Sequence, residues 1–272
     1  MGQRDSYSLC ILYIQVSLRK DFCLYQSTNS SSDICDQKFD KHVERCKVRP
    51  LPSGMISTTE AIIAFICWLP VTLIVTWMTM GPAATASFVP VWVLSTIYPF
   101  MKRIMPFPQV VLGAIIGGAV FPGWVGVTGD LNNMSQALPL FFATATWVVY
   151  FDVFYAMQDR PDDMKIGLNS LAIFLGNNIQ VPLAVLCASQ VILFAITAVQ
   201  AELSLIFWVL GLGVWMVSVP WHIMTLDLKD RNSGGVVFKR NIKLGLYLTV
   251  VSLVELFVVR VYDVNWALVK LK

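Results

Sequence analysis

Three aspartates, Asp159, Asp162 and Asp163, stand close together in the segment Tyr155–Ser170, which reads YAMQDRPDDMKIGLNS. The segment directly follows a long apolar run. If that run continues as a helix, Asp152, Asp159 and Asp163 are spaced by seven and four residues and share one face. Carboxylates crowded on one face repel each other, so a cation is expected among them, and Mg²⁺ is the usual one where phosphates complete its shell. The alternative interpretation is a solvated acidic loop that ends a transmembrane helix.

A second acidic group occupies residues 32–40, which read SDICDQKFD. Asp33, Asp36 and Asp40 have the spacing i, i+3 and i+7, which again predicts one helical face. Basic residues alternate along the chain directly after this group, namely Arg45, Lys47 and Arg49. Two acidic groups with bases beside them fit a diphosphate held through Mg²⁺, because carboxylates bind the metal and Arg or Lys neutralises the remaining phosphate charge. An apolar cavity between helices would house a hydrophobic tail.

The elements that must position these groups are membrane helices. The chain of 272 residues is 56% hydrophobic, only 14% charged, and has a mean hydropathy of +0.65, which excludes an ordinary soluble domain. We therefore expect an all-α, multi-pass transmembrane bundle with seven readable spans. These are Ala61–Met78, Ala86–Tyr98, Gln109–Val125, Ala137–Tyr155, Val181–Val199, Leu203–Pro220 and Leu244–Val261. The second span is short, and Pro90 predicts that it is broken or re-entrant.

Charged side chains gather in the loops on one side of these spans, which we call side A. Side A holds most of the basic residues, in segments 38–49, 102–103, 160–165 and 229–243, whereas the side-B loops hold none. The positive-inside rule places side A in the cytoplasm. A transporter, the alternative from another functional class, would carry charges or broken helices near the membrane midplane, and charges at one edge argue against it. The scattered cysteines and the two histidines lack the spacing of a zinc site.

The motifs together resemble the UbiA family of intramembrane aromatic prenyltransferases. Residues 33–54 resemble the family's first acidic motif, NDxxDxxxD, with the VERTKxRPLxSG-like stretch that follows it. Tyr155 and the aspartates that follow it resemble the second motif, YAxxDxxxD. Two further segments are similar to family loops: YPFMKR at 98–103 with PQVVLG at 108–113, and LDLKDRNSGGVVFKRNIKLG at 226–245. The resemblance thus assigns residues 33–272 to a UbiA-like transmembrane domain and leaves residues 1–32 unassigned.

This resemblance implies a nine-helix bundle around a central cavity, and transfer of an isoprenoid chain from an allylic diphosphate to an aromatic acceptor. It implies that five carboxylates hold Mg²⁺ and the diphosphate, those of Asp33, Asp36, Asp40, Asp159 and Asp163. The expected diphosphate contacts are Arg45, Arg49, Lys102 and Arg103, each with a lipid-headgroup anchor as the alternative role. Tyr155, Asp152 and Asp162 would support the site, with Tyr155 orienting an aspartate or the acceptor, or only packing.

The sequence departs from the family pattern in three places. Ser32 stands in place of the motif's Asn, and Asn169 stands in place of the usual Lys. Seven spans are readable against nine in the family, so we expect either a truncated start or an inactive family member without catalysis.

The motif spellings are most similar to the 4-hydroxybenzoate polyprenyltransferase branch. Within it, SLAIFLGNN after the second motif favours the fungal meroterpenoid group, which transfers a farnesyl-type chain to a phenolic acid or polyketide in an endomembrane of the ER type. The alternative is 4-hydroxybenzoate polyprenyl transfer for ubiquinone at the mitochondrial inner membrane. The N-terminus lacks the Arg and Ser enrichment of a mitochondrial transit peptide.

Overall fold

The computed structural model describes residues 33–44 and 46–261, and in this part of the chain every regular element is a helix. The expected all-α transmembrane bundle is confirmed. Residues 33–40 are helical and lead into a turn-rich loop, 41–57. The helices that follow are α3 (Thr58–Ile104), α4 (Gln109–Gly118), α5 (Val120–Thr128), η1 (Met134–Ala137), α6 (Leu138–Ile166), α7 (Leu171–Leu175), α8 (Gln180–Gln200), the π-helical η2 (Phe207–Gly213), α9 (Val214–Met224) and α10 (Arg231–Val261).

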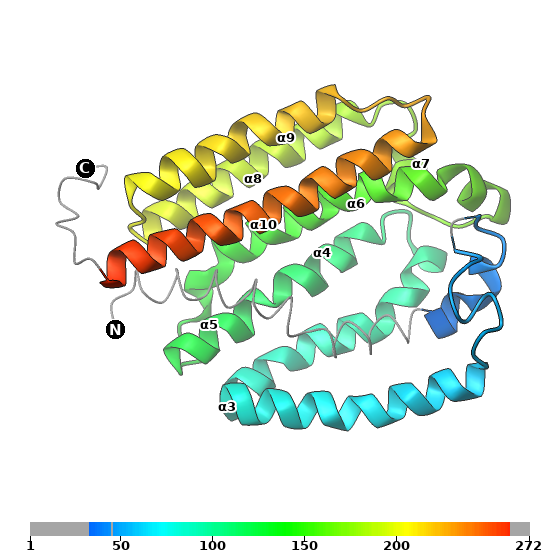
Figure 1. Ribbon diagram of the computed structural model, residues 1–272, viewed down its shortest axis with the longest axis horizontal. Helices are drawn as coiled ribbons and strands as arrows, with labels where there is room; N and C mark the ends of the chain where they lie inside the picture. Colours follow the sequence, from blue (N-terminus) through cyan, green and yellow to red (C-terminus); the bar gives the residue numbers. More distant parts are fainter. Residues whose placement is uncertain (1–32, 45, 262–272) are drawn as a thin grey trace.

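Within the described residues, six helices are long and apolar enough to cross a membrane, and α3 is long enough to cross it twice. Its 47 residues would measure about 70 Å as one straight helix, against a hydrocarbon core of about 30 Å. Gly81 divides it, with a left-handed φ of 80° that a residue with a side chain rarely adopts. Figure 1 shows α3 turning back on itself, so its two arms and the other five helices account for the seven expected spans.

Two boundaries differ from the sequence-based expectation. The break that we expected at Pro90 is wrong, because Pro90 stands inside the second arm, which continues as helix to Ile104. The kink at Gly81 lies between the first two expected spans, Ala61–Met78 and Ala86–Tyr98, and confirms that they are separate. Pro82 directly follows this kink, at the start of the second arm. The backbone N–H at a helix start has no partner within the helix, so a proline there costs no hydrogen bond. The last helix begins at Arg231 and not near Leu244, because its basic first turns are helical as well.

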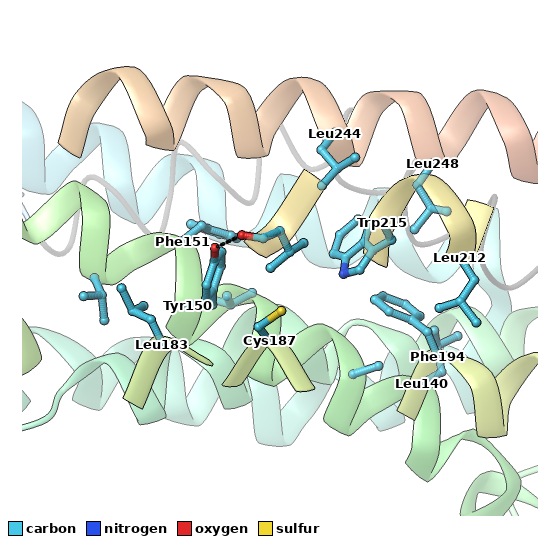
Figure 2. Close-up of a cluster of buried hydrophobic side chains, with 14 of the residues drawn as sticks. Leu140, Tyr150, Phe151, Leu183, Cys187, Phe194, Leu212, Trp215, Leu244 and Leu248 are labelled. Atoms are coloured by element: carbon cyan, nitrogen blue, oxygen red, sulfur yellow. Dashed lines mark hydrogen bonds between the residues drawn. The ribbon is translucent and has the colours of Figure 1, made fainter. Parts of the chain in front are cut away.

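The helices surround a core of aromatic and aliphatic side chains (Figure 2). In it the Tyr150 hydroxyl of α6 donates to the carbonyl of Val219 in α9 at 2.7 Å. Trp215 of α9 lies against Phe194 of α8, and its indole N–H donates to Gln190 at 3.3 Å. These bonds satisfy polar groups that would otherwise be left without partners in an apolar interior.

A buried carboxylate fixes α10 against the start of the η2–α9 helix. Glu255, 1% exposed, accepts from the backbone N–H of Ser204 at 2.7 Å and also from its hydroxyl. A helix N-terminus favours a negative charge, so this carboxylate caps the helix from a neighbouring element. The contact lies far along α10 from the end that carries the basic residues.

Glycines let α4 approach α6 at backbone distance. A Cβ on Gly113 would lie 2.8 Å from the carbonyl oxygen of Ala145, and one on Gly117 would lie 3.0 Å from the Ala145 nitrogen. Small residues at such crossings allow the van der Waals packing that drives helix association in membranes.

Replacing Gly117 by Val should therefore push α4 away from α6 and lower the thermal stability of the detergent-solubilised protein by several degrees. The matched control is Val110→Leu on the same helix, where the side chain is exposed and little change is expected. Melting curves of both variants by intrinsic fluorescence check this, and equal melting temperatures would contradict the assigned packing role.

Candidate active site

The two acidic motifs lie at the same end of the bundle. In Figure 1 the helix 33–40 and its following loop, drawn in blue, stand beside the end of α6 and α7, and the α9–α10 connection reaches the same end. One hydrogen bond joins the motifs directly, since the backbone N–H of Glu44 donates to Asp162 Oδ2 at 3.4 Å. This end corresponds to side A of the sequence analysis.

Helix α6 carries the second motif without interruption. It continues through Pro161 to Ile166 and ends at Gly167, whose φ of 70° and N–H bond to the Asp163 carbonyl form a C-cap. The helix on which the spacing argument depended is therefore present, and Asp152, Asp159 and Asp163 share one of its faces. Asp159 is only 9% exposed. The acids therefore stand on a rigid helix and not in a solvated loop.

The first motif is also helical, and two arginines hold its carboxylates. Arg49 donates to Asp33 at 3.1 Å and to Asp40 at 3.0 Å. Arg103 donates to Asp36 at 3.3 Å, and its guanidinium lies 4.8 Å from the Phe39 ring centroid. Charge-assisted bonds of this kind fix the orientation of both partners. Sequence reasoning found Arg49 and Arg103 but not these pairings.

The charge on Arg49 is secure. Its burial alone would lower the pKa, but Cys46, Asp40, Tyr155 and Asp33 together outweigh that and raise the pKa of Arg49 above its ordinary value. The guanidinium therefore stays positive at any physiological pH. It also lies within electrostatic range of both motifs, because Asp40 belongs to the first and Tyr155 to the second.

Two site residues were missed by sequence reasoning. Tyr98, in the second arm of α3, lies within electrostatic range of Asp152, Asp36 and Tyr155, and so stands near both motifs. Arg231, the first residue of α10, donates to Asp162 at 2.6 Å. Tyr98 begins the YPFMKR stretch whose resemblance was noted, which was the available signal. Nothing in the sequence pairs Arg231 with a residue 69 positions away.

The other predicted residues have separate outcomes. The ring of Tyr155 packs on Phe238 of α10 with centroids 5.0 Å apart, so it has the packing contact that we considered. Arg45 and Ser32 lie outside the described residues, as does the side chain of Lys102. The metal role of Asp33, Asp36, Asp40, Asp159 and Asp163 stays a prediction.

The carboxylates suit Mg²⁺ by their chemistry. Among the described residues, no three or more His, Cys, Asp or Glu side chains are grouped closely enough to hold a metal by themselves. Mg²⁺ usually needs only one or two carboxylates, because waters and substrate phosphates fill its other positions. Two motifs that each supply hard oxygen ligands at the same bundle end, with Asp36, Asp40 and Asp159 mostly buried, meet that requirement.

An apolar cavity of about 490 Å³ lies between the second arm of α3 and helices α4, α5 and α6. Val91 and Leu94 line it, and Tyr98 follows them at helical spacing. One face of this arm therefore leads from the acidic motifs towards the cavity.

The comparisons with known proteins agree with these features. A profile of the UbiA prenyltransferase family matches residues 15–247. The polyprenyl transferase macG of Penicillium terrestre is 74% identical over 259 residues, which cover 95% of this chain and 80% of macG. The polyprenyl transferase yanG of Aspergillus niger is 68% identical over 241 residues, 89% of this chain and 72% of yanG.

A 4-hydroxybenzoate octaprenyltransferase of Pseudomonas aeruginosa is 36% identical over 215 residues, which cover 79% of this chain and 71% of that protein. Among solved structures, a UbiA homologue from Archaeoglobus fulgidus bound to GPP and Mg²⁺ superposes with a TM-score of 0.68. The two share 16% identity over 93% of this chain and 94% of the other, so the likeness is one of fold.

Proposed function

The chain belongs to the UbiA prenyltransferase family and is a polyprenyl transferase, and we propose that it transfers a farnesyl-type chain from an allylic diphosphate to a phenolic aromatic acid or polyketide. The reaction would serve meroterpenoid biosynthesis. The observation that carries the proposal is the meeting of two acidic helices and two arginines at one end of an apolar bundle. Proteins named polyprenyl transferase in fungi support the secondary-metabolite assignment.

The transfer exchanges one bond for another. The bond between C1 of the prenyl chain and its diphosphate oxygen breaks, and the electron pair leaves on the diphosphate. A ring carbon ortho to the phenol then forms a C–C bond with C1, and the ring proton passes to a basic oxygen at the site. The difficult part is charge separation, so groups that stabilise the departing diphosphate supply most of the catalysis.

The carboxylates that would hold Mg²⁺ are those of Asp33, Asp36 and Asp40 from the first motif and Asp159 and Asp163 from the second. Bound there, the metal would neutralise charge on the departing diphosphate. The arginines keep these carboxylates oriented and add positive charge next to the phosphates. Apolar helices around the site exclude water, which would otherwise capture the allylic cation. The cavity beside α3 offers room for the apolar tail.

Side A would face the cytoplasm, with an endomembrane of the ER type as the location and the mitochondrial inner membrane as the alternative. The activity that matches the mitochondrial location is 4-hydroxybenzoate polyprenyl transfer. The relative that supports it is 36% identical, whereas the fungal relative macG, which supports the meroterpenoid reaction, is 74% identical. An inactive family member is the remaining alternative.

The test uses membranes containing the full chain, Mg²⁺, and a matrix of diphosphates and acceptors. Dimethylallyl, farnesyl and long-chain polyprenyl diphosphates are each offered with 4-hydroxybenzoate and with a panel of orsellinic-acid-like phenols. We expect a prenylated phenol from farnesyl diphosphate, detected by mass spectrometry. Preferential prenylation of 4-hydroxybenzoate by the long-chain donor would support the ubiquinone alternative, and no product with any pair would contradict both.

A further inference from the structure

We propose that Asp162 is a positioning residue that holds the two acidic motifs together through Arg231 and the loop 41–57, and that it is not a ligand of the metal. The proposal rests on the proposed function, because it assigns a role within the same site. It separates Asp162 from its neighbours Asp159 and Asp163, which the second motif presents as one acidic group.

The carboxylate of Asp162 is already occupied by partners from the protein. Its Oδ2 accepts from Arg231 Nη2 at 2.6 Å and from the Glu44 N–H at 3.4 Å, and its Oδ1 lies 3.5 Å from Lys165 Nζ. The side chain is 11% exposed. Both oxygens of this carboxylate therefore have donors from the protein, and Arg231 balances its charge.

The three partners belong to three different segments. Arg231 opens α10, Glu44 stands in the loop that carries Arg49, and Lys165 stands one turn further along α6. Lys165 is 75% exposed, so its contact is of the weak surface kind. The first two contacts are therefore the ones that connect elements distant in the sequence.

The Arg231 end of this connection is rigid. Close to it on α10, Gly234 packs against the carbonyl of Phe154 on α6 with no room for a Cβ, and Gly235 packs against the end of the Gln158 side chain on the same helix. This contact fixes the first turn of α10 on α6 and hence the place of Arg231. Glu44, at the other end of the connection, lies in a loop made of turns. Its bond to Asp162 therefore fixes the position of that loop relative to α6 and α10.

The consequence for the site follows from the position of Arg49. The loop that Asp162 holds also presents Arg49, which binds Asp33 and Asp40 of the first motif. Loss of the Asp162 contacts would leave the chemistry of each motif intact but loosen the spacing between them. Binding of a diphosphate that must touch both motifs would then weaken, while the bond-breaking step would be largely preserved once the substrate is bound.

The test compares Asp162→Asn and Arg231→Gln, alone and combined, with Lys165→Gln as the matched control on the same carboxylate. We expect each single variant to raise KM for the prenyl diphosphate about tenfold, as for outer partners of metal ligands, with kcat within a factor of about three. The double variant should equal Asp162→Asn, because Arg231 acts on the site through that carboxylate. Lys165→Gln should behave as the unaltered protein.

A second readout needs neither metal nor turnover. Trypsin should cut the loop at Lys41 and Lys47 severalfold faster in metal-free membranes of Asp162→Asn and Arg231→Gln than in the control. Arg231→Gln alters a side chain that is 38% exposed, so it tests the proposal even if Asp162→Asn fails to fold. A collapse of kcat in Asp162→Asn with unchanged cleavage would identify a metal ligand and overturn the proposal, as would unchanged KM and cleavage in both variants. If the unaltered protein transfers no prenyl group, the proposed function fails. The cleavage rates then still decide whether Asp162 has the proposed positioning role.

Discussion

Asp159→Asn is expected to lower kcat/KM for prenyl transfer by about a hundredfold to a thousandfold, the loss typical of removing one preorganised group that stabilises developing charge. Asp159 is mostly buried on the rigid part of α6, two turns beyond Asp152 on the same face. Asparagine keeps the size and shape of the side chain but removes the negative charge that would hold the metal. The fold should therefore be retained while the diphosphate loses its stabilisation.

The control for this prediction is Asp130→Asn. Asp130 lies in the turn between α5 and η1, where it accepts bonds from Asn132 and Asn133, at the opposite end of the bundle. Initial rates over a range of Mg²⁺ concentrations, with protein amounts matched by quantitative immunoblot, make the comparison. Asp159→Asn with at least one third of the unaltered rate would refute the assigned metal role.

The second large effect is expected for Arg49→Met, which removes a guanidinium that binds both Asp33 and Asp40. Two carboxylates then repel each other, one of them largely buried, and the positive charge near the phosphates is lost. We expect kcat/KM to fall about a hundredfold, with most of the change in KM for the diphosphate. Arg49→Lys keeps the charge but not the forked guanidinium that reaches two carboxylates. Its kcat/KM should therefore lie between those of the unaltered protein and Arg49→Met.

Lys41→Gln serves as the control for Arg49, because Lys41 is an exposed base in the same loop. Its kinetic constants should match those of the unaltered protein. An Arg49→Met variant with unchanged KM would contradict the assigned diphosphate contact and would favour a lipid-headgroup anchor, the alternative role considered for each base.

The spans could be predicted from the sequence because a long, uninterrupted apolar stretch identifies a membrane helix. The sequence left open whether α6 continues beyond Tyr155 or ends in an acidic loop, and the structure shows the helix continuing through Pro161 to Ile166. The separation of the two arms of α3 was predicted between Met78 and Ala86, where Gly81 adopts a φ that ends the first arm. The additional break at Pro90 was wrong, because the membrane helix continues through that proline. The start of α10 was also missed, because its lysines and arginines are typical of a loop although the helix extends beyond the apolar stretch.

The candidate site was predictable as a set of charges but not as a set of contacts. Acid spacing indicated which carboxylates share a face. Which arginine binds which aspartate depends on how α6, α10 and the loop 41–57 pack, and on glycines such as Gly234 that permit the approach. Asp162 illustrates the limit: its motif presents it as one acid among three, and only the fold shows Arg231 and Glu44 bound to it.

The most direct test of the central claim is the binding of an unreactive farnesyl thiolodiphosphate to the purified full chain with and without Mg²⁺. If the two motifs together hold a diphosphate through the metal, the dissociation constant should rise at least about tenfold when EDTA removes Mg²⁺, and Asp159→Asn should show the weak binding at any Mg²⁺ concentration. Equal affinity with and without the metal in the unaltered protein would contradict the account.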